Sequence, residues 1–270
     1  MANQRPIGIF DSGAGGLTVA KEVMGLMPNE NIIYFGDSLR APYGSRSDQE
    51  LIAFSREIIT FLMSRDIKAL VVACGTISTR IFDHIKEMMP QGFPIFEVAS
   101  PGAKAAANAS KSGNIGIIAT QGTVESKTFE RLILELNKDA KPTSKACPLF
   151  VPLVEEGEVG SKKADDIAKE YLSHFDDRDI DTLILGCTHY PFLVESIKKA
   201  LGYGVVIVNP AEQLAYDVKD ELKKKGMLSD TCNPSLEFFV SGDKEKFEMN
   251  LTSIIKGQND IKILKTATVS

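Results

Sequence analysis

Short apolar segments alternate with longer amphipathic segments along almost the whole chain. Residues 6–10 have the apolar composition of a buried strand, a glycine-rich turn covers 11–16, and a helical pattern begins at about Leu17. A strand at 31–36 and a helix at about 47–64 repeat this order. Strands that alternate with helices are typical of mainly parallel sheets with helices on both faces, so the pattern predicts an α/β fold.

One segment of the chain occurs twice. Residues 65–74, Arg-Asp-Ile-Lys-Ala-Leu-Val-Val-Ala-Cys, return as residues 178–187, Arg-Asp-Ile-Asp-Thr-Leu-Ile-Leu-Gly-Cys, 113 positions further on (187 − 74). Each copy reads as an apolar strand that stops at a small residue and then presents a cysteine, Cys74 or Cys187. If duplication built two halves that face one another, these two thiols would meet across one cleft.

The second copy predicts a second set of strands and helices. Residues 115–118 echo the first strand, and the segments that match the second strand, the long helix and the third strand are 146–153, 164–175 and 182–186. The tail adds a helix, a strand, a further helix and a last strand, with the strands at 236–241 and near 261–264. We expect the tail to complete one of the two sheets, because it is too short for a third domain.

The repeat therefore predicts two pseudo-symmetric α/β domains with mainly parallel sheets. The first domain comprises residues 1–98 and 211–270, and the second comprises residues 99–210. Ligands of such sheets bind at the carboxyl ends of the strands, where the polar clusters of this chain lie. The active site is therefore predicted in the cleft between the domains.

Composition and charge narrow the class of protein. The chain has 270 residues, of which 43% are hydrophobic and 25% are charged, as in ordinary soluble globular proteins. A net charge of −5 argues against nucleic acid as the main partner, since basic surfaces dominate that binding. No apolar run has the length of a signal peptide or a membrane span, so we expect a cytoplasmic protein. The four cysteines form no Cys-x-x-Cys pair, and reduced thiols are expected.

The two repeated cysteines allow three interpretations. Free cysteines at strand ends are commonly small buried hydrophobes, whereas matching positions in two repeats favour a function for Cys74 and Cys187. A helix start after each thiol would lower its pKa from about 8.5 and raise its thiolate fraction. Zinc bound by both cysteines and His189 is the third interpretation, but structural zinc takes four ligands, so we predict no metal. We interpret His189 as an acid-base partner of Cys187.

Three polar segments at strand ends are candidate binding or catalytic sites. Glycines in the turn at 11–16 would let backbone amides approach an anion, although Asp11 or Ser12 could equally cap the next helix. The turn lacks the Gly-Lys-Ser/Thr of a phosphate-binding loop and the spacing of a dinucleotide-binding turn. Pro42-Tyr43-Gly44 has the chemistry of a turn, and Glu155 follows a predicted strand.

Together these segments resemble the glutamate racemases of the aspartate/glutamate racemase family. The resemblance runs from about Ile7 to Ile207 and is sharpest in the Cys-Thr-His-Tyr-Pro run that begins at Cys187. The segments that carry it are Asp11-Ser12-Gly13-Ala14-Gly15-Gly16-Leu17-Thr18-Val19, Tyr34-Phe35-Gly36-Asp37, Pro42-Tyr43-Gly44, Val72-Ala73-Cys74, Val151-Pro152-Leu153-Val154-Glu155 and Gly186-Cys187-Thr188-His189-Tyr190-Pro191.

The resemblance implies a cofactor-independent racemase that interconverts L- and D-glutamate and supplies D-glutamate for peptidoglycan. Without a cofactor as electron sink, such a site must stabilise a carbanion by preorganised donors and exclude water. By motif, Cys74 would take the α-proton from D-glutamate and Cys187 from L-glutamate. Asp11 would assist Cys74, while His189 and Glu155 would support Cys187. The residues implied to hold the substrate are Asp11, Ser12, Pro42, Tyr43, Gly44, Gly75, Thr76, Thr188 and His189.

The resemblance also implies partners beyond the substrate. Members of the family commonly form homodimers, and some bind and inhibit DNA gyrase. The first strand begins within the first ten residues, without the N-terminal extension of relatives that need a peptidoglycan-precursor activator. Activity without an activator is therefore expected.

Gly75 departs from the Cys-Asn-Thr sequence that is usual in the family, where the asparagine helps to bind the substrate. Loss of one neutral hydrogen bond would cost about 1 kcal/mol, which affects affinity or substrate choice before catalysis. Two alternatives follow from this departure. One is a two-thiol racemase for another acidic amino acid such as aspartate, and the other is a catalytically impaired binding or regulatory member of the family.

Overall fold

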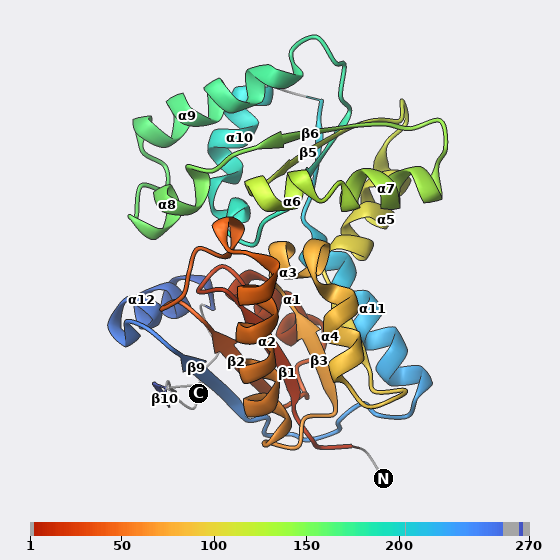
Figure 1. The fold of residues 1–270 in the computed structure, drawn as a ribbon, viewed down its shortest axis with the longest axis vertical. Helices are drawn as coiled ribbons and strands as arrows, with labels where there is room; N and C mark the ends of the chain where they lie inside the picture. The colour runs from red at the N-terminus through yellow and green to blue at the C-terminus, as the bar shows by residue number, and fades with distance from the viewer. Residues whose placement is uncertain (1–2, 203, 256–264, 267–270) are drawn as a thin grey trace.

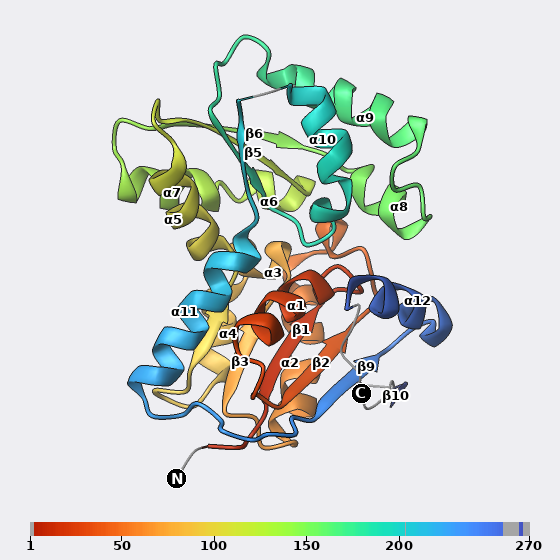
Figure 2. The ribbon, with the colours of Figure 1, turned by 180° about the vertical axis from the view of Figure 1, so that it is seen from behind.

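Two parallel β-sheets, each covered by helices, make up the protein (Figure 1, Figure 2). The computed structural model describes residues 3–202, 204–255 and 265–266. Within these described ranges, the larger sheet has six strands in the order β10-β9-β2-β1-β3-β4. These strands are β1 (Ile7–Asp11), β2 (Ile32–Gly36), β3 (Ala69–Val72), β4 (Ile95–Glu97), β9 (Leu236–Val240) and β10 (Lys265–Thr266). The predicted α/β fold is thus confirmed.

The smaller sheet has four strands in the order β6-β5-β7-β8. They are β5 (Asn114–Ala119), β6 (Lys141–Ala146), β7 (Thr182–Leu185) and β8 (Val206–Val208), and all of them pair in parallel. We call the six-stranded sheet with the helices packed on it the first lobe, and the four-stranded sheet with its helices the second lobe. Figure 1 shows the second lobe above the first.

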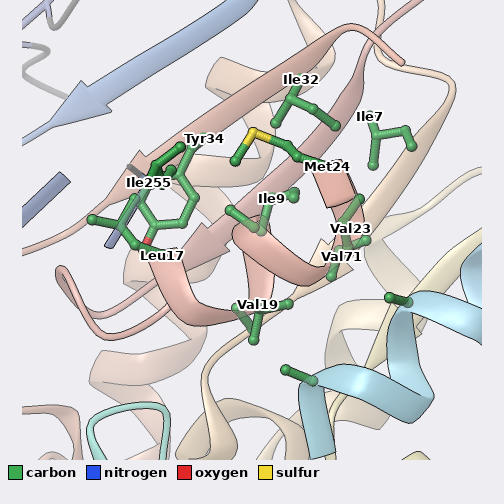
Figure 3. Packing of buried hydrophobic residues seen from close by; sticks show 14 of the residues in the cluster. Ile7, Ile9, Leu17, Val19, Val23, Met24, Ile32, Tyr34, Val71 and Ile255 are labelled. Atoms are coloured by element: carbon green, nitrogen blue, oxygen red, sulfur yellow. The ribbon is translucent and has the colours of Figure 1, made fainter. Parts of the chain in front are cut away.

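Helices cover both faces of the sheet in the first lobe. One face carries α1 (Leu17–Leu26), α11 (Pro210–Lys224) and α12 (Lys244–Ile254), and the other carries α2 (Asp48–Met63), α3 (Gly75–Arg80) and α4 (Phe82–Met88). Successive strand residues enter different cores, with Ile9 on the α1 side and Phe10 on the α2 side. Figure 3 shows the first of these cores, where Ile9, Val71 and Val23 gather between the sheet and α1. Burial on both faces explains why these strands read as continuous apolar runs.

The second lobe has the same layered arrangement. Helices α5 (Ala99–Ala109) and α7 (Thr128–Leu136) pack on one face of its sheet, and α8 (Phe150–Glu155), α9 (Lys162–Leu172) and α10 (Val194–Leu201) pack on the other. The short helix α6 (Gln121–Glu125) follows β5, and single 3₁₀ turns form η1 (Tyr43–Ser45), η2 (Ser173–Phe175) and η3 (Tyr190–Leu193). Each lobe therefore has its own sheet and its own cores.

The repeated sequence occupies equivalent places in the two lobes. In the first lobe β1 pairs with β3 so that Ile7 lies beside Ala69. In the second lobe β5 pairs with β7 so that Ile115 lies beside Thr182. These are the residues that the sequence repeat relates, at displacements of 108 (115 − 7) and 113 (182 − 69). The duplication thus extends to the register of the strands.

The strand predicted at 146–153 is wrong. β6 ends at Ala146, and residues 150–155 form α8 instead. A short apolar run does not by its periodicity distinguish a buried strand from a buried helix. Here Phe150 and Leu153, three positions apart, are both buried and share one face of the helix.

The tail of the chain joins the first lobe. β9 pairs with β2 in parallel, and α12 packs on the face of the same sheet that carries α1. The strand predicted near 261–264 falls outside the described residues, and the domain boundaries at 98 and 211 stay a prediction. In the described ranges, no helix combines the length and apolar character needed to cross a bilayer.

Candidate active site

Loops from both lobes enclose a cavity of about 280 Å³, and both repeated cysteines line it. Cys74 follows β3 in the first lobe, and Cys187 follows β7 in the second. The carboxyl ends of parallel strands are the usual place for a ligand site, because loops with free polar groups gather there. The lining residues are Ser12, Ser38, Ala41, Pro42, Tyr43, Gly44, Cys74, Gly75, Thr76, Thr120, Val151, Pro152, Glu155, Cys187, Thr188, His189 and Lys246.

The Cys74 thiol is held in its neutral form. It stands at the start of α3, and only 4% of the residue is exposed. Burial and the nearby Asp11 carboxylate raise the pKa of Cys74 to about 12, although the Ile77 amide and the Ser12 hydroxyl oppose the change. The expectation that the helix start lowers the pKa of this thiol is therefore wrong, because desolvation outweighs the helix amides. In this state Cys74 carries a proton that it could donate.

Asp11 lies behind the cavity wall at the end of β1 and is fully buried. Its Oδ2 atom accepts hydrogen bonds from the amides of Gly13 at 3.1 Å and Gly16 at 2.9 Å. Its Oδ1 atom accepts one from the Thr188 hydroxyl of the second lobe at 3.3 Å. Burial raises the pKa of Asp11, while the charge of His189 and the amides oppose the rise. Two amides of the glycine-rich turn therefore bind a side chain of the turn itself. The capping interpretation is wrong, because α1 has no side-chain cap and the amides that Asp11 binds precede the helix.

Cys187 is the first of four side chains that contact one another in series: Cys187, His189, Glu155 and Lys246. Its Sγ atom is 3.9 Å from His189 Nδ1, and His189 Nε2 is 2.9 Å from Glu155 Oε1. Lys246 of α12 is the last side chain in the series, with its Nζ atom 3.0 Å from Glu155 Oε2. The side chain of Glu155 remains 30% exposed, whereas that of His189 is 6% exposed. These contacts link the second lobe to α12 of the first lobe, and all four residues line the cavity.

The pKa values of this group favour an imidazolium next to the Cys187 sulfur. Burial disfavours charge on His189, but the contacts with Cys187 and Glu155 outweigh it and raise the pKa of His189 to about 10. The hydrogen bond from His189, helped by Lys246 and opposed by burial, lowers the pKa of Glu155 to about 2. The two thiols therefore have different neighbours: the Asp11 carboxylate lies near Cys74, and the His189 ring lies beside Cys187.

Pro42, Tyr43 and Gly44 form one wall of the cavity. The Tyr43 hydroxyl donates to the buried Asp37 carboxylate, which also accepts from Arg40 Nε and Ser241 Oγ, each at 2.6 Å. Burial and Asp37 raise the pKa of Tyr43, so the phenol stays neutral. With its hydroxyl engaged in this network, Tyr43 offers its ring and its backbone to the cavity.

A row of threonine hydroxyls crosses from one lobe to the other. Thr76 Oγ1 of α3 lies 3.2 Å from Thr120 Oγ1, and Thr120 Oγ1 in turn lies 3.1 Å from Thr123 Oγ1. Thr120 was not among the predicted site residues, although the repeat could have identified it. It stands 108 positions after Ser12 (120 − 12), at the same place after the strand. Lys246 was also missed, and since the tail has no counterpart in the repeat, no such signal pointed to it.

Nearly all of the predicted site residues meet at this cavity, with Asp11 directly behind the wall. The zinc alternative for Cys74, Cys187 and His189 receives no support, because the described residues contain no group of three or more His, Cys, Asp or Glu side chains placed to hold a metal ion. The other two cysteines do not line the cavity: Cys147 is buried and Cys232 is exposed.

Comparisons with known proteins agree with the motifs. The model of the Asp/Glu/Hydantoin racemase family matches residues 18–216. The chain is 46% identical to a glutamate racemase of Thermoanaerobacter sp. (strain X514) over 243 residues. The matched region covers 90% of each of the two chains. It superposes on a glutamate racemase isoform from Bacillus anthracis with a TM-score of 0.93 at 38% identity, over 99% of this chain and 98% of that chain. A Francisella tularensis glutamate racemase in complex with D-glutamate gives a TM-score of 0.91 at 36% identity, over 98% of both chains.

Proposed function

Because the chain belongs to the Asp/Glu/hydantoin racemase family, we propose that it is a glutamate racemase, an isomerase that interconverts L- and D-glutamate without a cofactor. The observation that carries this proposal is the pair of cysteines, one from each copy of the repeat, on the wall of a single cavity. Racemisation removes a proton from one face of a carbon and adds one to the opposite face. Two thiols on opposite lobes supply both steps.

In the direction from L- to D-glutamate, Cys187 acts first. The His189 imidazolium stabilises its thiolate, which takes the α-proton of L-glutamate. Cys74, neutral because of its raised pKa, then gives its proton to the opposite face. The products are D-glutamate, a Cys187 thiol and a Cys74 thiolate, so the roles are exchanged and the enzyme is set for the reverse reaction. Asp11 supports Cys74 as an acid by raising the pKa of the thiol, and Glu155 supports Cys187 by holding His189 charged.

The remaining cavity residues are proposed to bind the substrate. Glutamate has two carboxylates and one ammonium group, and the cavity lining includes serine and threonine residues together with Glu155, His189 and Lys246. At about 280 Å³ the cavity is slightly smaller than the roughly 300–1,000 Å³ that is usual for ligand pockets. The proposed substrate-binding residues in the cavity lining are Ser12, Pro42, Tyr43, Gly44, Gly75, Thr76, Thr188 and His189, with Thr120 and Lys246 as added candidates. Asp11, the ninth residue of the original set, would act from behind the wall through its contact with Thr188.

Isotope exchange tests the proposal. Incubation with L-glutamate in deuterated water, with no cofactor added, is expected to give D-glutamate with deuterium at Cα. The absence of both inversion and exchange would refute racemase activity and would favour the impaired binding or regulatory alternative. Aspartate, the alternative substrate, is tested in parallel; a difference of one methylene typically separates substrates by about 10- to 200-fold. Preferred turnover of aspartate would replace glutamate as the proposed substrate.

The family resemblance supports further proposals about the setting of this activity. The protein would work in the cytoplasm as a homodimer and would supply D-glutamate for peptidoglycan. Light scattering of the purified protein tests the dimer. Binding to DNA gyrase is a separate proposal, which a pull-down with purified gyrase tests.

A further inference from the structure

Two glycines, one from each lobe, bring the two backbones into direct contact beside the thiols. Gly75 begins α3 immediately after Cys74, and Gly186 lies between the end of β7 and Cys187. A Cβ atom on Gly75 would lie 2.4 Å from the carbonyl oxygen of Gly186, whereas ordinary van der Waals contact begins at 3.4 Å. Real Cβ atoms essentially never approach another atom below 3.0 Å, so only glycine fits here as the lobes stand.

Neither segment can give way locally at low cost. Gly186 donates a backbone hydrogen bond to Ile118 at 2.8 Å, and a Cβ on Gly186 would itself lie 2.9 Å from the Ile118 oxygen. On the other side, the Gly75 carbonyl accepts from Thr79 Oγ1 at 2.9 Å within α3. The atom that a Gly75 side chain would meet is therefore backbone tied into a sheet. The remaining way to relieve the contact is to move the lobes apart.

We propose that Gly75 is a positioning residue that sets the separation of the Cys74 and Cys187 thiols. This inference rests on the two-thiol function proposed above. A side chain at Gly75 has to lengthen the 2.4 Å approach to at least 3.4 Å, which displaces one segment by about 1 Å (3.4 − 2.4). Each glycine is the chain neighbour of a proposed catalytic cysteine, so the displacement passes directly to the thiols.

A displacement of this size matters for proton transfer. The donor and acceptor must come within about 2.6–3.2 Å of each other, and a misplacement of about 1 Å can cost about 100-fold in rate. The geometry also gives a second reason for the presence of Gly75 in place of the asparagine that is usual in the family. Gly75 is adapted to a closer approach of the lobes, so Gly75→Asn lowers activity instead of restoring it.

The test compares Gly75→Ala and Gly75→Asn with Gly25→Ala as a matched control. Gly25 lies on the exposed side of α1, and a Cβ there meets no atom within 4 Å. We expect kcat to fall about 10- to 100-fold in both directions for the Gly75 variants, with KM changed by less than about threefold. Gly25→Ala is expected to keep the kcat and KM of the unchanged protein.

Deuterium incorporation gives a readout that a loss of stability would not change. In the unchanged protein the second thiol quickly transfers deuterium to the carbanion, so deuterium appears mainly in the inverted product. When the second thiol is farther away, the first thiol has time to exchange with solvent and to return deuterium on the same face. The ratio of deuterium in recovered substrate to deuterium in product is therefore expected to rise about tenfold in Gly75→Ala.

Three results would overturn the inference. They are a kcat of Gly75→Ala within about twofold of the control, a reduced kcat with an unchanged deuterium ratio, and failure of Gly75→Ala to fold while Gly25→Ala folds. The last result counts because each lobe has its own core, which a change of spacing leaves intact. An unchanged protein without racemase activity refutes the proposed function instead.

Discussion

Replacing Glu155 by glutamine tests whether His189 is an imidazolium. The substitution keeps the shape of the side chain and removes its charge, 2.9 Å from His189 Nε2. The pKa of Glu155 falls from 4.5 to about 2, mainly through His189. At about 1.4 kcal/mol per pKa unit this corresponds to about 3 kcal/mol. Lys246 shares in that energy and solvent reaches 30% of the side chain, so the contact with His189 accounts for about 1–2 kcal/mol.

The sign of the pH dependence follows from the raised pKa of His189. In the folded protein His189 keeps its proton to about pH 10, whereas the unfolded chain loses it near 6.5. The stabilisation is therefore complete below about pH 6.5 and is lost as the pH rises towards 10. Glu155 acts in the opposite range, where its contribution is complete above 4.5 and is lost as the pH falls towards 2.

The assay is the thermal midpoint measured from pH 6 to pH 10 for the unchanged protein and for Glu155→Gln. We expect the midpoint of the unchanged protein to fall across this range and that of Glu155→Gln to start lower and fall less. Glu156→Gln is the matched control, because Glu156 is the exposed neighbour and pairs with Lys163 instead. Parallel curves for the unchanged protein and Glu155→Gln would refute the assignment of an imidazolium stabilised by Glu155.

Two further predictions concern the thiols and the tail. Cys74→Ser is expected to abolish racemisation while L-glutamate still gains deuterium through Cys187, as proton NMR of the Cα–H signal would show; equal exchange into both enantiomers would contradict separate faces. Lys246→Met removes the cation that pairs with Glu155 Oε2 at the cavity mouth and is expected to raise KM for glutamate about 3- to 10-fold. Lys244→Met, on the same helix but outside the cavity lining, is its control, and equal KM values for the two variants would exclude a role for Lys246.

The sequence predicted the parts of the site that depend on residues near one another in the chain, such as a cysteine directly after an apolar strand. Cys74 and Cys187 follow apolar strands in two copies of one segment, and strand ends of parallel sheets meet, so their shared cavity could be expected. The pattern before Glu155 predicts a strand where the structure has α8, because a short apolar run fits a strand and a buried helix equally well.

The rest of the site depends on contacts between distant segments. Lys246 reaches Glu155 from the tail, and nothing near either residue in sequence indicates the pairing. The raised pKa of Cys74 depends on burial and on Asp11, neither of which a helix start reveals. The approach of Gly75 to Gly186 is likewise a property of the packed lobes, although the unusual glycine was visible in the sequence.

The place of β9 beside β2 has a consequence for the order in which the protein folds during synthesis. Asp37, just after β2, and Ser241, just after β9, share a hydrogen bond although they are 204 positions apart in the chain. The strands of the second lobe, which end at Val208, have all been made before β9 leaves the ribosome. Synthesis of the first lobe starts earlier, but its folding is completed later. The edge of β2 stays unpaired until β9 has been synthesised. Lys246 reaches the cavity last, so a nascent chain holds both thiols well before it holds a complete site.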